Sequence, residues 1–126
     1  MSSGGLRFPK SARLLKGAEF RRVYREGRKF VGPLFAAFYR GADESEPARV
    51  GWTVPKALGN AVERNRIKRR LREAVRIRLP LLAPGWEVVF HPRRAATEAD
   101  FALLRDEVER LFAQLASARR NAGRGT

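Results

Sequence analysis

Apolar residues recur at three- and four-residue spacing in three segments of the chain, a pattern that predicts three helices. The first helix is predicted over residues 16–26. The second is a long helix that Asn60 can cap at its start, where Glu63 three residues later completes an arrangement close to a capping box, and that Pro80 ends. The third follows Thr97, a possible capping residue, over residues 98–117.

Three shorter runs are rich in aromatic and β-branched residues, and they predict strands at 33–41, 48–55 and 84–92. Each run is bounded by Pro or Gly. An acidic, polar turn at 41–48 separates the first two runs. We therefore predict that these two strands pair antiparallel across an exposed loop.

The order of these elements predicts one α+β domain, since no internal repeat or linker interrupts the 126 residues. We assign the domain to residues 13–116, a flexible N-terminal arm to 1–12 and a flexible basic C-terminal tail to 117–126. No apolar run approaches the roughly 18–20 residues that span a bilayer, and none forms the core of a signal peptide. A soluble, cytoplasmic protein is expected.

The charge of the chain changes this picture most. Lys and Arg number 27 against 13 acidic residues, which gives a net charge of +14. Such an excess favours a polyanionic partner, with nucleic acid first and an anionic membrane surface second. The absence of cysteine and the single histidine exclude a disulfide framework, a cysteine-ligated zinc site and a multi-histidine metal site.

Much of the positive charge lies on the long predicted helix, in the stretch GNAVERNRIKRRLRE. On a helical wheel, one arc is apolar and faces a core: Ile67, Leu71, Ala74 and Val75. A separate arc is polar and basic: Asn65, Lys68, Arg69, Arg72 and Arg76. Like charges four residues apart repel, so this density predicts a surface for phosphates rather than a face built only for solubility.

Residue spacing leaves both RNA and DNA open as partners. A helix-turn-helix is disfavoured, because a strand and the stretch VPKALG precede the basic helix where a supporting helix would be needed. Catalysis by the chain itself is also disfavoured. Its carboxylates are scattered apart from Asp43, Glu44 and Glu46 in a polar turn, and His91 at a strand end is interpreted as structural.

The sequence resembles the family of protein subunits of bacterial ribonuclease P. The resemblance is carried by GNAVERNRIKRRLRE, by RVGWTVPK before it, and by RLLKGAEFRRVYREG and DFALLRDEVERLFAQL near the two ends. It covers residues 13–115 in order. One departure is clear: the family commonly has Ser-Lys-Lys where Pro55-Lys56-Ala57 stand here, so one cation is lost.

The resemblance implies a sandwich with the element order α-β-β-β-α-β-α and a small mixed sheet. It also implies a first short strand near residues 29–31 and a left-handed β-α-β crossover, which runs against the general rule. The family's function would be to assist a catalytic RNA in removing the 5′ leader of precursor tRNA. The RNA would carry out the hydrolysis with Mg²⁺, and the protein would hold no metal tightly.

The resemblance also assigns site residues. Those facing the catalytic RNA would be Lys56, Arg64, Asn65, Arg66, Lys68, Arg69 and Arg72. Those holding the precursor tRNA leader would be Arg13, Phe20, Tyr24 and Phe38. Aromatic rings beside cations hold single strands without strict sequence reading, although core packing is an alternative for Phe20, Tyr24 and above all Phe38. The implied partners are these two RNAs, and neither DNA nor a membrane.

Two other classes of protein remain as alternatives. A structural RNA-binding protein of ribosomal type would share the charge and the size but would need no cleft for a leader. A membrane-surface module would need aromatic anchors, and the apolar arc of the basic helix has none.

Overall fold

The computed structural model describes the backbone of residues 17–124 and the side chains of residues 17–118. The elements follow the predicted order α-β-β-β-α-β-α. They are α1 (Gly17–Glu26), β1 (Arg28–Val31), β2 (Phe35–Gly41), β3 (Arg49–Trp52), α2 (Ala61–Arg78), β4 (Trp86–Pro92) and α3 (Phe101–Arg124). Three short 3₁₀ turns connect them: η3 (Lys56–Leu58), η4 (Leu79–Leu81) and η5 (Arg94–Thr97). The predicted arm and Arg13 lie outside the described residues.

The four strands form one mixed sheet in the order β1-β2-β4-β3. β2 pairs antiparallel with both β1 and β4, whereas β3 pairs parallel with β4. The predicted antiparallel pair of β2 and β3 is therefore wrong, because β4 lies between them. The chain leaves β3, passes through α2 and returns in β4, so this crossover links neighbouring parallel strands.

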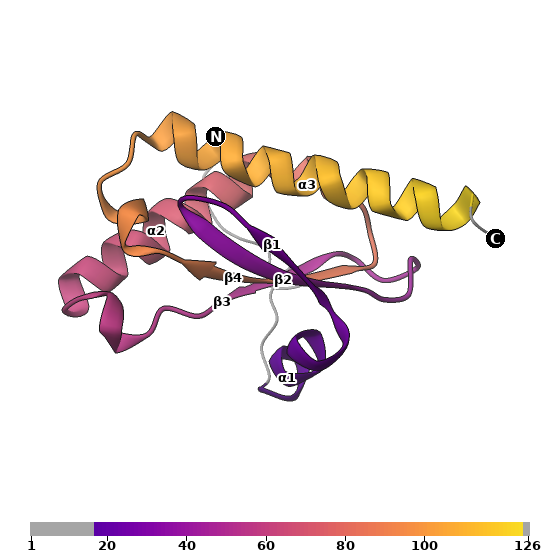
Figure 1. Cartoon of the computed structure of the whole chain (residues 1–126), viewed down its shortest axis with the longest axis horizontal. Helices are drawn as coiled ribbons and strands as arrows, with labels where there is room; N and C mark the ends of the chain where they lie inside the picture. The colour runs from indigo at the N-terminus through magenta and orange to yellow at the C-terminus, as the bar shows by residue number, and fades with distance from the viewer. Residues whose placement is uncertain (1–16, 125–126) are drawn as a thin grey trace, which may run out of the picture.

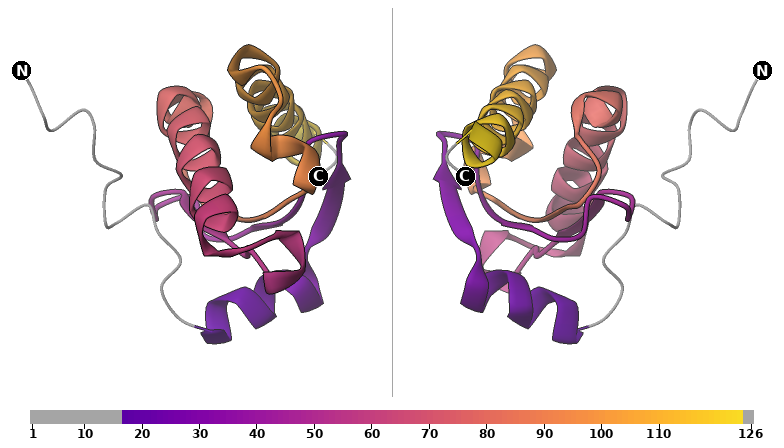
Figure 2. Two further views of the ribbon diagram at one scale, coloured as in Figure 1. Left: turned by 90° about the vertical axis from the view of Figure 1, so that its left-hand side faces the viewer. Right: turned by 90° about the vertical axis from the view of Figure 1, so that its right-hand side faces the viewer.

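Helices cover both faces of the sheet. α2 and α3 lie side by side on one face, and α1 lies on the opposite face (Figures 1 and 2). The main core fills the first interface and includes Phe35, Phe90, Leu71 and Phe112, all with at most 1% of their surface exposed. A small second cluster on the α1 side joins the buried Val23 and Val89.

The apolar stripes predicted for α2 and α3 explain their docking. Ile67, Leu71, Ala74 and Val75 are all fully buried on α2, as predicted. On α3, the predicted stripe is buried from Leu104 to Leu115, and only Phe101 at its start is partly exposed. Burial of these stripes fixes the rotation of each helix about its axis, so the opposite faces are fixed as well.

The start of α2 is closed by the predicted capping box. The Asn60 side chain accepts a hydrogen bond from the Glu63 amide, and the Glu63 carboxylate accepts one from the Asn60 amide, both at 2.9 Å. Gly59 precedes the cap with φ 143°, a conformation that side chains disfavour, and a Cβ there would meet the Glu63 side chain. This turn sets the direction in which α2 leaves the sheet.

We expect Asn60→Ala to lower the free energy of unfolding by ~1 kcal/mol, because the amide of Glu63 loses its acceptor. Urea denaturation followed by far-ultraviolet circular dichroism measures the change. Asn65→Ala is the matched control, since Asn65 is exposed inside the same helix, where alanine is the better helix former. Equal destabilisation by both substitutions would contradict the capping role.

The start and end of α3 differ from the prediction. Thr97 belongs to η5 and does not cap α3; instead the Asp100 carboxylate accepts a hydrogen bond from the Ala102 amide at 3.1 Å. The helix continues to Arg124, through most of the segment predicted as a tail. Its alanines and arginines favour helix, and no glycine interrupts the segment before Gly123.

Candidate nucleic-acid interface

Asn65, Lys68, Arg69 and Arg72 form the basic face of α2. The first three are exposed and Arg72 is half-buried. Within residues 17–118, the side chains of Lys68, Arg69 and Arg72 have no ion-pair partner. Their charges are therefore available to an external anion, and the buried stripe on the other side of the helix holds them in place.

The neighbouring Arg76, predicted on the same arc, is neutralised within the protein. Its guanidinium donates to the Glu73 carboxylate at 2.5 and 2.9 Å. This hydrogen bond holds the pKa of Glu73 below its ordinary value and raises that of Arg76. The cationic surface of α2 is thus concentrated on the turns before Glu73.

Other arginines of α2 bind backbone carbonyls, a role that the sequence did not indicate. Arg66 donates from Nε to the Thr97 carbonyl at 2.9 Å, and Arg64 donates to the Gly59 carbonyl at 3.1 Å. Arg70 donates to the carbonyls of Ala96 and Ala99. Arg64 and Arg66, both predicted to face RNA, therefore also fasten α2 to the turns around it.

Lys56 lies in η3, immediately before α2, and is exposed. Arg94 of η5 donates to the Ala57 carbonyl at 2.7 Å, so the two 3₁₀ turns are tied together. The segment from Thr53 to Lys56 leads from the end of β3, on the sheet, to the start of α2. Lys56 thus extends the basic face of α2 towards the sheet.

On the α1 side of the sheet, Phe20, Tyr24, Phe38 and His91 form an aromatic patch. Phe20 and Phe38 pack against the same small apolar cluster and are partly buried. The Tyr24 and Phe38 rings meet edge to face with centroids 5.2 Å apart, and Tyr24 is 39% exposed. Three of the four residues predicted to hold a leader are brought together here, and the fourth, Arg13, lies outside the described residues.

His91 is a member of this patch that sequence reasoning did not assign to the site. Its ring centroid lies 5.1 Å from that of Phe38, and its Nε2 lies 2.9 Å from the Tyr24 hydroxyl. Lys29 places its ammonium 5.4 Å from the Phe38 ring centroid. The alternation of β4 was a usable signal, because His91 stands two residues after Val89 and so shares its face of the sheet.

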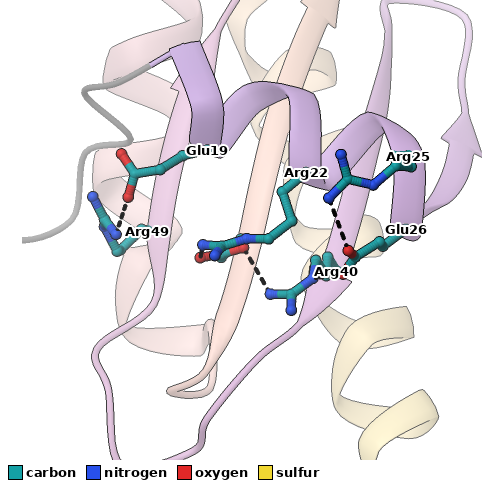
Figure 3. Close-up of polar contacts among 7 residues, drawn as sticks. Glu19, Arg22, Arg25, Glu26, Arg40 and Arg49 are labelled. Carbon is teal, nitrogen blue, oxygen red and sulfur yellow. Dashed lines mark hydrogen bonds and ion pairs between the residues drawn. The ribbon is translucent and has the colours of Figure 1, made fainter.

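Ion pairs hold α1 on the sheet (Figure 3). The buried Glu87 accepts from Arg22 at 3.0 Å and from Arg40 at 3.1 Å. Arg40 also binds Glu26 at 2.8 Å. At the other end of the helix, Glu19 pairs with Arg49. These carboxylates neutralise Arg22, Arg40 and Arg49, whereas the basic face of α2 has no such partners within residues 17–118.

The pKa of Glu26 lies below its ordinary value of 4.5, mainly because Arg40 and then Arg25 donate hydrogen bonds to it. A lowered folded-state pKa contributes stability above pH 4.5 that is lost as the pH falls through the folded value. We expect Glu26→Gln to lower the thermal midpoint slightly at pH 7 and by less at pH 3. The exposed Asp106→Asn is the control, since Asp106 has no ion pair within residues 17–118.

The fold and the two surfaces together define a class: a small cationic α+β protein with unpaired charges on one helix and an aromatic patch on the opposite face of its sheet. The sequence model of one family, Ribonuclease P, matches residues 8–116. The chain belongs to the ribonuclease P protein family, as the resemblance indicated.

Known relatives and solved structures agree with this family assignment. The ribonuclease P protein component of Symbiobacterium thermophilum is 40% identical over 103 residues, which cover 82% of this chain and 90% of the relative. That of Gluconacetobacter diazotrophicus is 55% identical over 65 residues, 52% of this chain and 56% of the relative.

The RNase P protein of Staphylococcus aureus superposes with a TM-score of 0.69 at 27% identity, covering 85% of this chain and 96% of that protein. The RNase P protein from Thermotoga maritima superposes with a TM-score of 0.72 at 25% identity, covering 81% of this chain and 96% of that protein. These structures confirm the α+β class and the element order.

Proposed function

We propose that this chain is the RNA-binding protein subunit of ribonuclease P and that the basic face of α2 contacts the catalytic RNA. The observation that carries this proposal is the set of unpaired charges on Lys68, Arg69 and Arg72, held in place by a buried stripe. Guanidinium groups bind phosphates in a bidentate manner, and each neutralised phosphate releases counterions. Lys56 and the outer nitrogens of Arg64 and Arg66 extend the same contact.

The aromatic patch is proposed to hold the 5′ leader of precursor tRNA. Exposed ring surface at Tyr24, next to the partly exposed Phe20 and Phe38, supports stacking of unpaired bases. Lys29 supplies a cation at the same place for the backbone phosphates. Thr53 contacts Tyr24 and Lys56 follows three residues later, so one strand of RNA could run from the patch to the basic face of α2.

Hydrolysis of the precursor is proposed to belong to the RNA, with Mg²⁺ bound there. Residues 17–118 contain no cluster of three His, Cys, Asp or Glu side chains that could hold a metal ion, so they do not fit a protein-bound catalytic metal. In the acidic turn, Asp43 Oδ1 accepts hydrogen bonds from the Ser45 amide and hydroxyl, so this oxygen is engaged within the turn itself. This protein would bind and position RNA.

The cytoplasm is the proposed location, because precursor tRNA is made there. Separately, none of the helices within residues 17–124 is both long and apolar enough to cross a membrane.

Cleavage of a 5′-labelled precursor tRNA by a bacterial ribonuclease P RNA tests the function. At low Mg²⁺, the RNA alone should cleave poorly, and added protein should restore cleavage at the mature 5′ end. Unchanged cleavage, with RNA binding that still weakens as salt rises, would instead favour a structural RNA-binding protein of ribosomal type.

A further inference from the structure

A hydrogen-bond chain of three side chains lies at the edge of the aromatic patch. The Tyr24 hydroxyl stands 2.9 Å from His91 Nε2 and 3.1 Å from Thr53 Oγ1. The three residues come from different parts of the fold, namely α1, β4 and the segment after β3. The Tyr24 and His91 rings also meet edge to face, with centroids 5.4 Å apart.

The charged groups around His91 are few. Burial lowers the pKa of His91 below its ordinary value of 6.5, and the nearby cation of Lys29 on β1 lowers it further. β2 contributes the uncharged ring of Phe38, and α1 contributes the Tyr24 phenol. No carboxylate among residues 17–118 contributes to the shift of His91. An anion that offsets the field of Lys29 must therefore come from outside these residues.

The direction of the hydrogen bonds among Thr53, Tyr24 and His91 depends on the charge of His91. A phenol has one proton, so Tyr24 can donate to only one of its two neighbours. When His91 is neutral, its Nε2 can accept from Tyr24, and Tyr24 then accepts from Thr53. When His91 is protonated, both ring nitrogens are donors, so Nε2 donates to Tyr24. Tyr24 then donates to Thr53, and the Thr53 hydroxyl can donate its own hydrogen bond to another acceptor.

We propose that Thr53, Tyr24 and His91 form a proton-responsive contact for single-stranded RNA. Protonation adds a positive charge beside Lys29 and turns the Thr53 hydroxyl into a donor for the RNA backbone. The aromatic patch then holds a phosphate that it holds weakly in the neutral state. This inference rests on the proposed function of the patch and adds the regulation of that same site.

Thermodynamic linkage between proton binding and RNA binding determines how RNA affinity should change with pH. Without RNA, burial and Lys29 make protonation of His91 unfavourable. A phosphate bound at the patch would favour the charged form and raise the pKa of His91. RNA affinity should therefore increase as the pH falls from 7.5 to 5.5. A rise of one pKa unit on binding corresponds to roughly a tenfold gain in affinity once the pH lies below both pKa values, and to a smaller gain above that.

The measurement is an NMR titration of the imidazole in the full chain, with any histidine-containing tag removed. His91 is the only histidine, so its resonances need no assignment. The titration is repeated with saturating oligouridylate, whose bases do not titrate between pH 5.5 and 7.5. We expect a pKa below 6.5 in the free protein and a higher value in the complex. Equal values in both states would overturn the inference.

Three variants separate the proton-responsive role from a purely structural one. His91→Gln keeps a polar partner for Tyr24 but cannot take a charge, so the pH dependence of oligouridylate binding should disappear. Thr53→Val removes the acceptor to which Tyr24 donates when His91 is protonated, so the pKa of His91 should fall further. Tyr24→Phe keeps the ring and should remove the effect of Thr53→Val. A normal pH dependence in His91→Gln would contradict the proposal.

Failure of this inference can be told from failure of the proposed function. The reconstituted enzyme is assayed at pH 7.5, where it should bind precursor tRNA more tightly than mature tRNA if the patch holds the leader. Absence of that preference removes the leader-binding role itself. A clear preference, combined with a His91 titration that RNA does not move, overturns the proton-responsive contact alone.

Discussion

Reversing the charges of Lys68, Arg69 and Arg72 to glutamate is expected to weaken binding of ribonuclease P RNA by on the order of 100- to 1,000-fold. Within residues 17–118 these cations have no ion-pair partner, so each is free to contact phosphate. Filter binding over a range of salt concentrations measures the effect. The slope of log affinity against log salt should also fall by roughly three.

The fold should survive this triple substitution. Lys68 and Arg69 are exposed, and the apolar stripe of α2 is untouched. Glutamates at positions 68 and 72 would face Arg64 and Arg76 with opposite charge at four-residue spacing, but they would repel each other, and a glutamate at position 69 would repel Glu73. These small effects largely cancel, so we expect the thermal midpoint to change little.

Arg110→Glu is the control for a change of net charge, provided that its thermal midpoint is measured as well, because Arg110 lies 3.8 Å from the buried Glu107 carboxylate. Arg110 lies on α3 beside Phe30, away from the basic face of α2. Its reversal should change RNA affinity far less than Arg69→Glu does. Equal losses from the two single substitutions would mean that net charge, and not this surface, determines binding.

The sequence could predict this surface because the signals that place it are local. The stripe from Ile67 to Val75 and the capping box at Asn60 depend on residues within a few positions of one another, and the structure confirms both. Rotation of the helix follows from the stripe. The contacts of Arg64 and Arg66 with backbone carbonyls could not be predicted, since they depend on where Gly59 and Thr97 lie in the fold.

The pairing of the strands is a feature that local sequence patterns predicted wrongly. A polar turn between two apolar runs is typical of a hairpin, and β2 and β3 have that pattern. The structure places β4 between them, although β4 is more than thirty residues further along the chain. Which strands become neighbours depends on the docking of α2 and α3, which spacing along one segment does not report.

The aromatic patch was predicted only in part for the same reason. The family resemblance assigned Phe20, Tyr24 and Phe38, and the structure brings them together. His91 comes from β4 and Thr53 from the segment after β3, so their approach to Tyr24 is a consequence of sheet order. Alternation along β4 places His91 on the face of Val89, but it does not indicate which ring on α1 would meet His91.

The patch itself leads to the second large expected effect. Tyr24→Leu should reduce the preference of the reconstituted enzyme for precursor over mature tRNA by ~5- to 150-fold, because one stacked base is worth about 1–3 kcal/mol. Dissociation constants for the two tRNAs, measured with and without the substitution, give the preference directly. Affinity for mature tRNA should change little, since it has no leader to stack.

Two further variants separate stacking from packing. Tyr24→Phe keeps the ring, so at pH 7.5 most of the preference should remain. Phe20→Leu keeps an apolar side chain against Val23 and Val89 but removes the ring, so the preference should fall while the thermal midpoint changes modestly. If Tyr24→Leu and Phe20→Leu both leave the preference intact in a folded protein, these rings serve the packing of α1, and the leader is held elsewhere.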